Sequence, residues 1–97
     1  MAMKNPPHPG SLVRHECLEA SEMKVGEAAE RLGITRQALS SIINERGAVT
    51  PEMALRFEQL GWSRAEVWVG MQGAYDLARA RQRGVEIPAS PSSSRAG

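Results

Sequence analysis

The fold is decided by residues 25–44, VGEAAERLGITRQALSSIIN, in which small and apolar residues fall where two helices that cross at a tight turn need them. Gly33 lies at the expected turn. The inward-facing set comprises Ala28, Ala29, Leu32, Ile34, Leu39 and Ile42. Units of this kind place their second helix in the major groove of DNA. The pattern therefore predicts a helix-turn-helix whose second helix directs its polar residues outward.

The length and composition favour one small all-α domain. The chain has 97 residues, of which 41% are hydrophobic and 4% aromatic. This suits short packed helices, and few segments alternate polar and apolar residues as strands do. The 12 Lys and Arg against 11 Asp and Glu leave a net charge of +1, far below that of many nucleic-acid binders. DNA binding must therefore come from local charge or from two subunits together.

Neither catalysis nor a membrane role is supported. The single Cys17 cannot form an internal disulfide, and no apolar run near the start suggests a secretion signal, so we expect a cytoplasmic protein. Apolar runs are too short to span a bilayer. His15 and Cys17 diverge on a helix, and no second cysteine completes a metal site. We therefore expect no enzymatic activity, no catalytic residue, no metal and no cofactor.

Five helices are expected, ordered by recurring start and stop signals. Their approximate ranges are 9–20, 25–32, 36–45, 51–60 and 64–83. Three hydroxyl residues are expected to cap helix starts, namely Thr35, Thr50 and Ser63. Residues 1–8 are expected to form a flexible arm, residues 9–83 the folded domain, and residues 84–97, which are rich in Pro and Ser, a disordered tail.

The side of the third expected helix that faces away from its apolar residues carries the candidate DNA contacts. They are Arg36, Gln37, Ser40, Ser41 and Asn44. Arg and Gln can bind the edges of guanine and adenine bidentately, while Ser hydroxyls reach bases or phosphates. Three flanking residues are expected on phosphates, namely Thr35, Arg46 and Lys24. The alternative interpretation is a solvated helix face on which Asn44 merely ends the helix.

A second copy of the chain is expected, because one unit reads few base pairs. A two-fold dimer would bind an inverted repeat in double-stranded operator DNA, with half-sites about 34 Å apart. The last helix, 64–83, is the expected dimerisation element, through Trp68, Met71 and Tyr75. Gly70 and Gly73 within it indicate close approach of another backbone, from this subunit or a second one. Alternatively, Trp68 and Met71 close the core and Tyr75 lies half exposed.

Several separated segments resemble the HigA-type antitoxins of the lambda-repressor-like (XRE) helix-turn-helix family. The similar segments are NPPHPG at 5–10, RLGITRQALSSIIN at 31–44, AVTPEMALRFE at 48–58 and EVWVGMQGAYDLARA at 66–80. The resemblance implies a five-helix, dimeric DNA-binding protein that neutralises a RelE-like (HigB-like) ribonuclease toxin and represses the operon encoding both. A stand-alone helix-turn-helix regulator without a toxin partner is the alternative.

The chain departs from the pattern of that family at the presumed DNA face. Val25 stands where such domains often carry a Gln that contacts phosphate, and Lys24 where a capping Ser or Thr is common. Ser41 replaces a frequent Arg. The resemblance therefore implies modest operator affinity, with Arg36 and Gln37 carrying recognition.

An acidic cluster in the first two helices is the expected toxin-binding surface, through Glu16, Glu19 and Glu22. Such a surface would repel DNA and attract a basic protein, mainly by raising the association rate. The alternative is that these residues form an ordinary solvated face.

Overall fold

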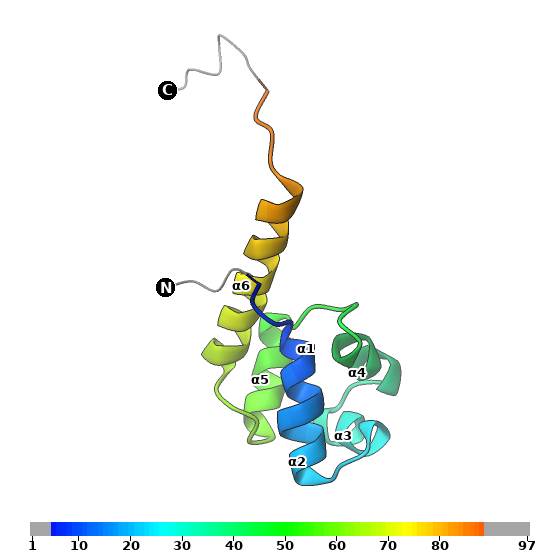
Figure 1. Ribbon diagram of the computed structural model, residues 1–97. Coiled ribbons are helices and arrows are strands. Elements are labelled where there is room, and N and C mark those ends of the chain that lie inside the picture. The colour runs from blue at the N-terminus through cyan, green and yellow to red at the C-terminus, as the bar shows by residue number, and fades with distance from the viewer. Residues whose placement is uncertain (1–4, 89–97) are drawn as a thin grey trace.

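The computed structural model describes residues 5–88, which form a helical domain with a long last helix that extends away from it (Figure 1). Three consecutive segments make up a continuous first helix: α1 (Pro9–Leu12), a π-helical stretch (Val13–Leu18) and α2 (Glu19–Ser21). The remaining helices are α3 (Val25–Leu32), α4 (Arg36–Ile43), α5 (Pro51–Gln59) and α6 (Ala65–Arg83). No strand occurs among residues 5–88. The predicted all-α fold of five helices is confirmed.

The turn between α3 and α4 is a Schellman motif centred on Gly33. Gly33 adopts φ +75°, and its N–H donates to the Glu30 carbonyl at 3.1 Å. The next N–H, of Ile34, donates to the Ala29 carbonyl at 3.0 Å. These two bonds satisfy the last carbonyls of α3 and turn the chain directly into α4. A residue with a side chain would be strained at this φ, which explains the glycine.

Two of the three expected helix caps are confirmed. The hydroxyl of Thr35 accepts the Ala38 N–H at 3.0 Å, and that of Thr50 accepts the Met53 N–H at 3.2 Å. Ser63 was expected to cap the last helix, and that prediction is wrong. Ser63 lies at φ +65°, and α6 begins at Ala65 after Arg64, which makes no capping side-chain bond within the described part of the chain.

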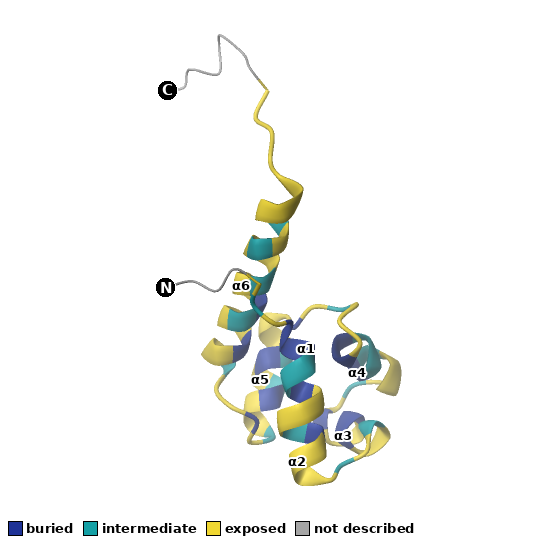
Figure 2. Cartoon of the chain, in the orientation of Figure 1, coloured by how far each residue is buried: buried dark blue, intermediate teal, exposed yellow. Residues whose placement is uncertain are grey.

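The core lies between the first helix, α3, α4 and the α5–α6 pair (Figure 2). Every member of the expected inward set is buried except Ile34, which is half-buried. Three aromatic rings fill the side toward α6, with the Phe57 ring 4.9 Å from Trp68 and 5.6 Å from Trp62. The Trp68 indole N–H donates to the Trp62 carbonyl, so this buried polar group is satisfied.

The segment before α1 is held against the domain by His8. The expected flexible arm is therefore wrong at this residue, since His8 is only 4% exposed and its Nδ1 accepts the Gly10 N–H at 2.8 Å. Gly10 in turn touches α4, because a Cβ there would lie 1.9 Å from the Ile42 carbonyl oxygen. Residues 1–4 lie outside the described residues.

α6 packs on α5 along its first turns and extends beyond the domain. Residues 84–88 continue as an exposed segment without helix or strand, and the rest of the expected disordered tail, 89–97, lies outside the described residues. Among the helices that the structure describes, none is both long enough and apolar enough to span a membrane.

Candidate nucleic-acid interface

The start of α4 presents the two residues expected to read bases. Thr35 caps the helix, and Arg36 and Gln37 follow it on the exposed surface. The opposite side of α4 buries Leu39 and Ile42 in the core. The apolar side thus anchors the helix while Arg36 and Gln37 project from it, as major-groove recognition requires.

Ser40 and Ser41 are less available than the sequence suggested, since both are half-buried. Ser41 lies against the turn that follows α4, where a Cβ on Gly47 would come within 2.7 Å of its Oγ. Its carbonyl accepts the N–H groups of Arg46 at 2.9 Å and Gly47 at 3.0 Å. Ser41 therefore shapes the end of the helix, whereas Arg46 stays exposed beside it.

The end of α4 carries a polar contact that the sequence did not reveal. Asn44 is the C-terminal cap residue of α4, and its amide donates to the Ser40 Oγ at 3.3 Å. Its Oδ1 accepts from the Arg14 guanidinium of the first helix at 3.1 Å. Asn44 thus ends the helix, as the alternative interpretation held, and it also holds Arg14 beside the recognition face. Arg14 is not among the residues that the sequence predicts for this site, because a contact between residues 30 positions apart leaves no local sequence signal.

The start of α3 lies next to the start of α4. A Cβ on Gly26 would lie 4.0 Å from Cδ of Arg36, so the side chain of Arg36 runs past the first turn of α3. Lys24 is the N-cap residue, and its side chain makes no capping bond within residues 5–88. The first N–H groups of α3 therefore have no side-chain cap, and uncapped N–H groups at a helix start are able to bind anions in general.

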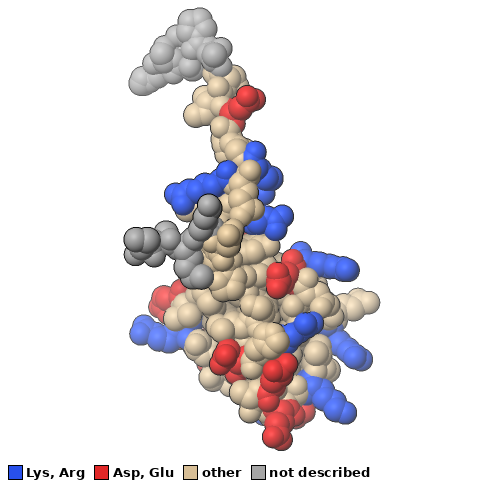
Figure 3. Space-filling model, in the orientation of Figure 1, with Lys and Arg blue, Asp and Glu red and all other residues tan. Residues whose placement is uncertain are grey.

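Basic side chains project along the side of the molecule formed by α3 and α4, while acidic ones gather near α2 (Figure 3). An open groove of about 780 Å³ runs between these regions, and Arg14, Lys24 and Arg36 lie along it. Glu19, Glu22 and Glu27 line the same groove. The cations therefore lie beside the recognition helix with carboxylates close to them.

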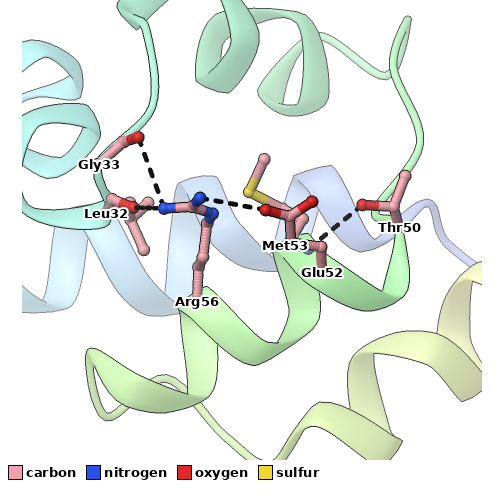
Figure 4. A network of polar contacts seen from close by, with 6 residues as sticks. All are labelled: Leu32, Gly33, Thr50, Glu52, Met53 and Arg56. Carbon is pink, nitrogen blue, oxygen red and sulfur yellow. Dashed lines mark hydrogen bonds and ion pairs between the residues drawn. The ribbon is translucent and has the colours of Figure 1, made fainter.

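A guanidinium from α5 fixes the turn of the motif (Figure 4). Arg56 donates to the Leu32 carbonyl at 2.7 Å and to the Gly33 carbonyl at 3.5 Å. Glu52 orients it through a 3.1 Å ion pair one turn earlier on the same helix. A cation at the C-terminus of α3 also favours the helix dipole.

Comparison with known proteins identifies the motif. The Helix-turn-helix family profile matches residues 15–60. Virulence-associated protein A of Dichelobacter nodosus is 40% identical over 78 residues, which cover 79% of this chain and 76% of that protein. The chain belongs to the helix-turn-helix family.

Two solved structures extend the likeness to nearly the whole domain. The antitoxin GraA superposes with a TM-score of 0.78 at 30% identity, over 87% of this chain and 98% of GraA. The Pseudomonas aeruginosa antitoxin HigA, solved with the higBA promoter, gives a TM-score of 0.77 at 27% identity, over 87% of this chain and 97% of that one. This helix-turn-helix protein is thus a DNA-binding regulator whose structural neighbours are HigA-type antitoxins.

The acidic cluster of this helix-turn-helix protein lies at the far end of the first helix from His8. Glu16, Glu19 and Glu22 are all exposed. Glu19 contacts His15 at 3.4 Å, and Glu22 adopts φ +55° where the first helix ends. Glu19 and Glu22 line the groove, to which Arg36 and Ile43 of α4 also contribute.

The structure corrects the expected dimer surface in α6. Trp68 is fully buried in the core of its own subunit, so it offers no surface to a partner. Tyr75 is half-buried, and its ring centroid lies 4.7 Å from that of His8. Met71 is half-buried too: it packs against the core and also lines an apolar groove between α6 and the segment before α1. The alternative interpretation therefore holds for Trp68 and Tyr75, and Met71 both contacts the core and reaches a surface.

The glycines of α6 face away from the domain. Described atoms lie no closer than 4 Å to a Cβ built on Gly70 or Gly73. Their neighbours Val67 and Leu77 are 44% and 51% exposed. Packing within the described chain therefore does not account for two glycines in the middle of a helix.

Burial suppresses the reactivity of Cys17. Burial, with a smaller contribution from Glu16, raises the pKa of its thiol from 9.0 to about 11. The thiolate, which is the nucleophilic and metal-binding form, is therefore scarce at neutral pH. Among residues 5–88, no three His, Cys, Asp or Glu side chains group closely enough to hold a metal ion.

Proposed function

We propose that this protein binds an inverted repeat in its own promoter as a homodimer, represses its operon and neutralises a RelE-like (HigB-like) ribonuclease toxin. The observation that carries the DNA part is the juxtaposition of the start of α3 with exposed Arg36 and Gln37 at the start of α4. Arg36 and Gln37 would read bases, and Lys24, Thr35 and Arg46 would contact phosphates. Arg14 would also contact a phosphate.

Dimerisation is assigned to the outward side of α6. Gly70 and Ala74 border the apolar groove with Val67 and Met71, and Pro6 and Pro7 form its other wall. A second α6 could approach closely over the glycines, which gives a reason for residues that each cost about 1 kcal/mol of helix propensity. We therefore place the dimer interface on the outward side of α6 rather than on the surface expected around Trp68.

DNA binding is tested by fluorescence anisotropy on duplexes from upstream of the reading frame. The double variant Arg36→Ala with Gln37→Ala should weaken binding at least roughly 30-fold, because each protomer of the dimer loses at least one base contact worth about 1–3 kcal/mol. The matched control is Arg64→Ala with Gln59→Ala, which removes the same groups from exposed positions remote from α4. Equal affinities for the two double variants would reject the α4 assignment.

Toxin neutralisation is supported by the likeness to GraA and HigA, and it is tested by co-expression with the product of the adjoining reading frame. The wild-type chain should restore growth and copurify with that product. Glu16→Lys with Glu19→Lys should weaken the complex, whereas the control Glu58→Lys with Glu86→Lys, with the same charge change elsewhere, should not. A chain that represses but rescues no toxin would be a stand-alone regulator.

A further inference from the structure

Two buried polar side chains, His8 and Gln72, lie where α6 contacts the segment before α1 and the loop that follows the recognition helix α4. They are 4% and 7% exposed. Neither belongs to the DNA face, and both make their contacts at the junction between the helix assigned to dimerisation and the helix assigned to DNA. Figure 1 shows the segment before α1 crossing α6 at this junction.

Three successive contacts connect α6 to α4 through His8. The His8 ring meets the Tyr75 ring of α6 edge-on, with centroids 4.7 Å apart and an interplanar angle of 78°. Its Nδ1 accepts the Gly10 N–H at 2.8 Å, which caps α1. Gly10 lies directly on the Ile42 carbonyl, with no room for a Cβ. These contacts link α6 at Tyr75 to the last turn of α4 by way of the start of α1.

Gln72 of α6 contacts the loop that follows α4, at Val49. Gln72 Oε1 accepts the Val49 N–H at 2.7 Å. Its Nε2 donates to Asp76 one turn later at 3.0 Å, which fixes the orientation of the amide. Val49 is itself buried in the core. Successive turns of α6 are thus linked to α4 twice, through His8 at the start of α1 and through Val49 in the loop that follows α4.

We infer that His8 and Gln72 are positioning residues that fix the angle between α4 and α6 and thereby set the spacing of the two half-sites that the dimer accepts. This inference rests on the proposed function, because α6 relates the two subunits only if the chain dimerises through it. One base pair changes the half-site separation by about 3.4 Å and rotates it by roughly 34°. A rigid junction rejects that change, whereas a loosened one tolerates it.

The experiment starts with a selection of the full chain on random-sequence duplex DNA, which yields its preferred inverted repeat. Affinity is then measured on that repeat, on the same repeat lengthened or shortened by one base pair, and on one half-site alone. His8→Asn places an amide oxygen where Nδ1 lies, so α1 keeps its cap while the ring contact is lost. Gln72→Met keeps the volume and removes the acceptor. Tyr75→Phe keeps the ring contact and serves as the matched control.

The wild type and Tyr75→Phe should prefer the selected spacing at least roughly tenfold over either altered spacing, since altered spacing misplaces one recognition helix in its groove. His8→Asn and Gln72→Met should reduce that ratio to about threefold or less, with half-site affinity and dimer mass unchanged. An unchanged ratio in folded variants, or a ratio lost equally in Tyr75→Phe, overturns the inference. If the wild type selects no inverted repeat, the proposed function itself fails.

Discussion

The guanidinium of Arg56 donates a 2.7 Å hydrogen bond to the carbonyl oxygen of Leu32, so that α5 holds the end of α3 at the turn of the motif. The same nitrogen would lie 2.9 Å from a Cβ at Gly33. The glycine and the arginine therefore depend on each other: the turn leaves space for the guanidinium, and the guanidinium satisfies the carbonyls that the turn presents.

Replacement of Arg56 by Ala should lower the free energy of unfolding by about 1–2 kcal/mol, because hydrogen bonds from a charged group contribute about 1.5–3 kcal/mol and this one is partly open to solvent. Urea denaturation followed by circular dichroism measures the change. Arg64→Ala, whose side chain is 78% exposed, should stay within about 0.5 kcal/mol of the wild type. A loss as small as in that control would show that the turn does not need Arg56.

Arg14→Ala should weaken operator binding and flatten its dependence on salt. Each lost phosphate contact reduces the slope of log affinity against log salt by about 0.9, so a dimer that loses two contacts should change by about 2. Anisotropy titrations at several salt concentrations measure the slope. Asn44→Ala should give a smaller change, since it releases the guanidinium without removing it. A wild-type slope in Arg14→Ala would place this residue outside the DNA interface.

The fold was predictable because its signals act over a few residues. Thr35 and Thr50 cap helices through N–H groups three residues away, and Gly33 ends α3 through its own φ. Ser63 has the same chemistry but does not cap α6. The neighbouring Trp62 carbonyl accepts from Trp68, and the Trp62 N–H donates to Phe57, so tertiary packing sets the backbone at this position.

The site residues could be predicted only where the spacing along one helix determines which side chains are exposed. Arg36 and Gln37 follow from helical spacing opposite the apolar residues of α4. Arg14 does not, because its partner Asn44 belongs to a distant part of the chain. The burial of His8 is not predictable either, because it depends on Tyr75 of α6, which is distant in the sequence.

The Cys17 thiol should alkylate slowly at neutral pH, since its pKa of about 11 leaves little thiolate. At pH 8 the folded protein should react with iodoacetamide about a hundredfold more slowly than the urea-unfolded chain at equal accessibility. Because the folded pKa lies above the usual 9.0, stability from this group is complete below pH 9 and is lost as the pH rises toward 11. Equal rates for folded and unfolded protein would contradict the assignment.

Gly10→Ala should destabilise the protein by about 3 kcal/mol or more, because its Cβ would overlap the Ile42 carbonyl oxygen and force the first helix away from α4. Thermal unfolding measures the loss. Gly26→Ala is the matched comparison, since the nearest atom to its Cβ is 4.0 Å away. If Gly10→Ala were as stable as Gly26→Ala, the close contact between α1 and α4 would not exist in solution.

Gly70→Ala should stabilise the isolated subunit but weaken the dimer. A Cβ at this residue meets no described atom within 4 Å, so the isolated subunit should gain about 0.5–1 kcal/mol from helix propensity. If a second α6 lies against the glycine, the same methyl group separates the two backbones, and the dimer dissociation constant measured by sedimentation should rise. The control is Gly26→Ala, which adds a methyl group outside α6 with no contact closer than 4.0 Å and should leave the dimer dissociation constant unchanged. A Gly70→Ala dimer as tight as the wild type would place the subunit interface elsewhere than on the outward side of α6.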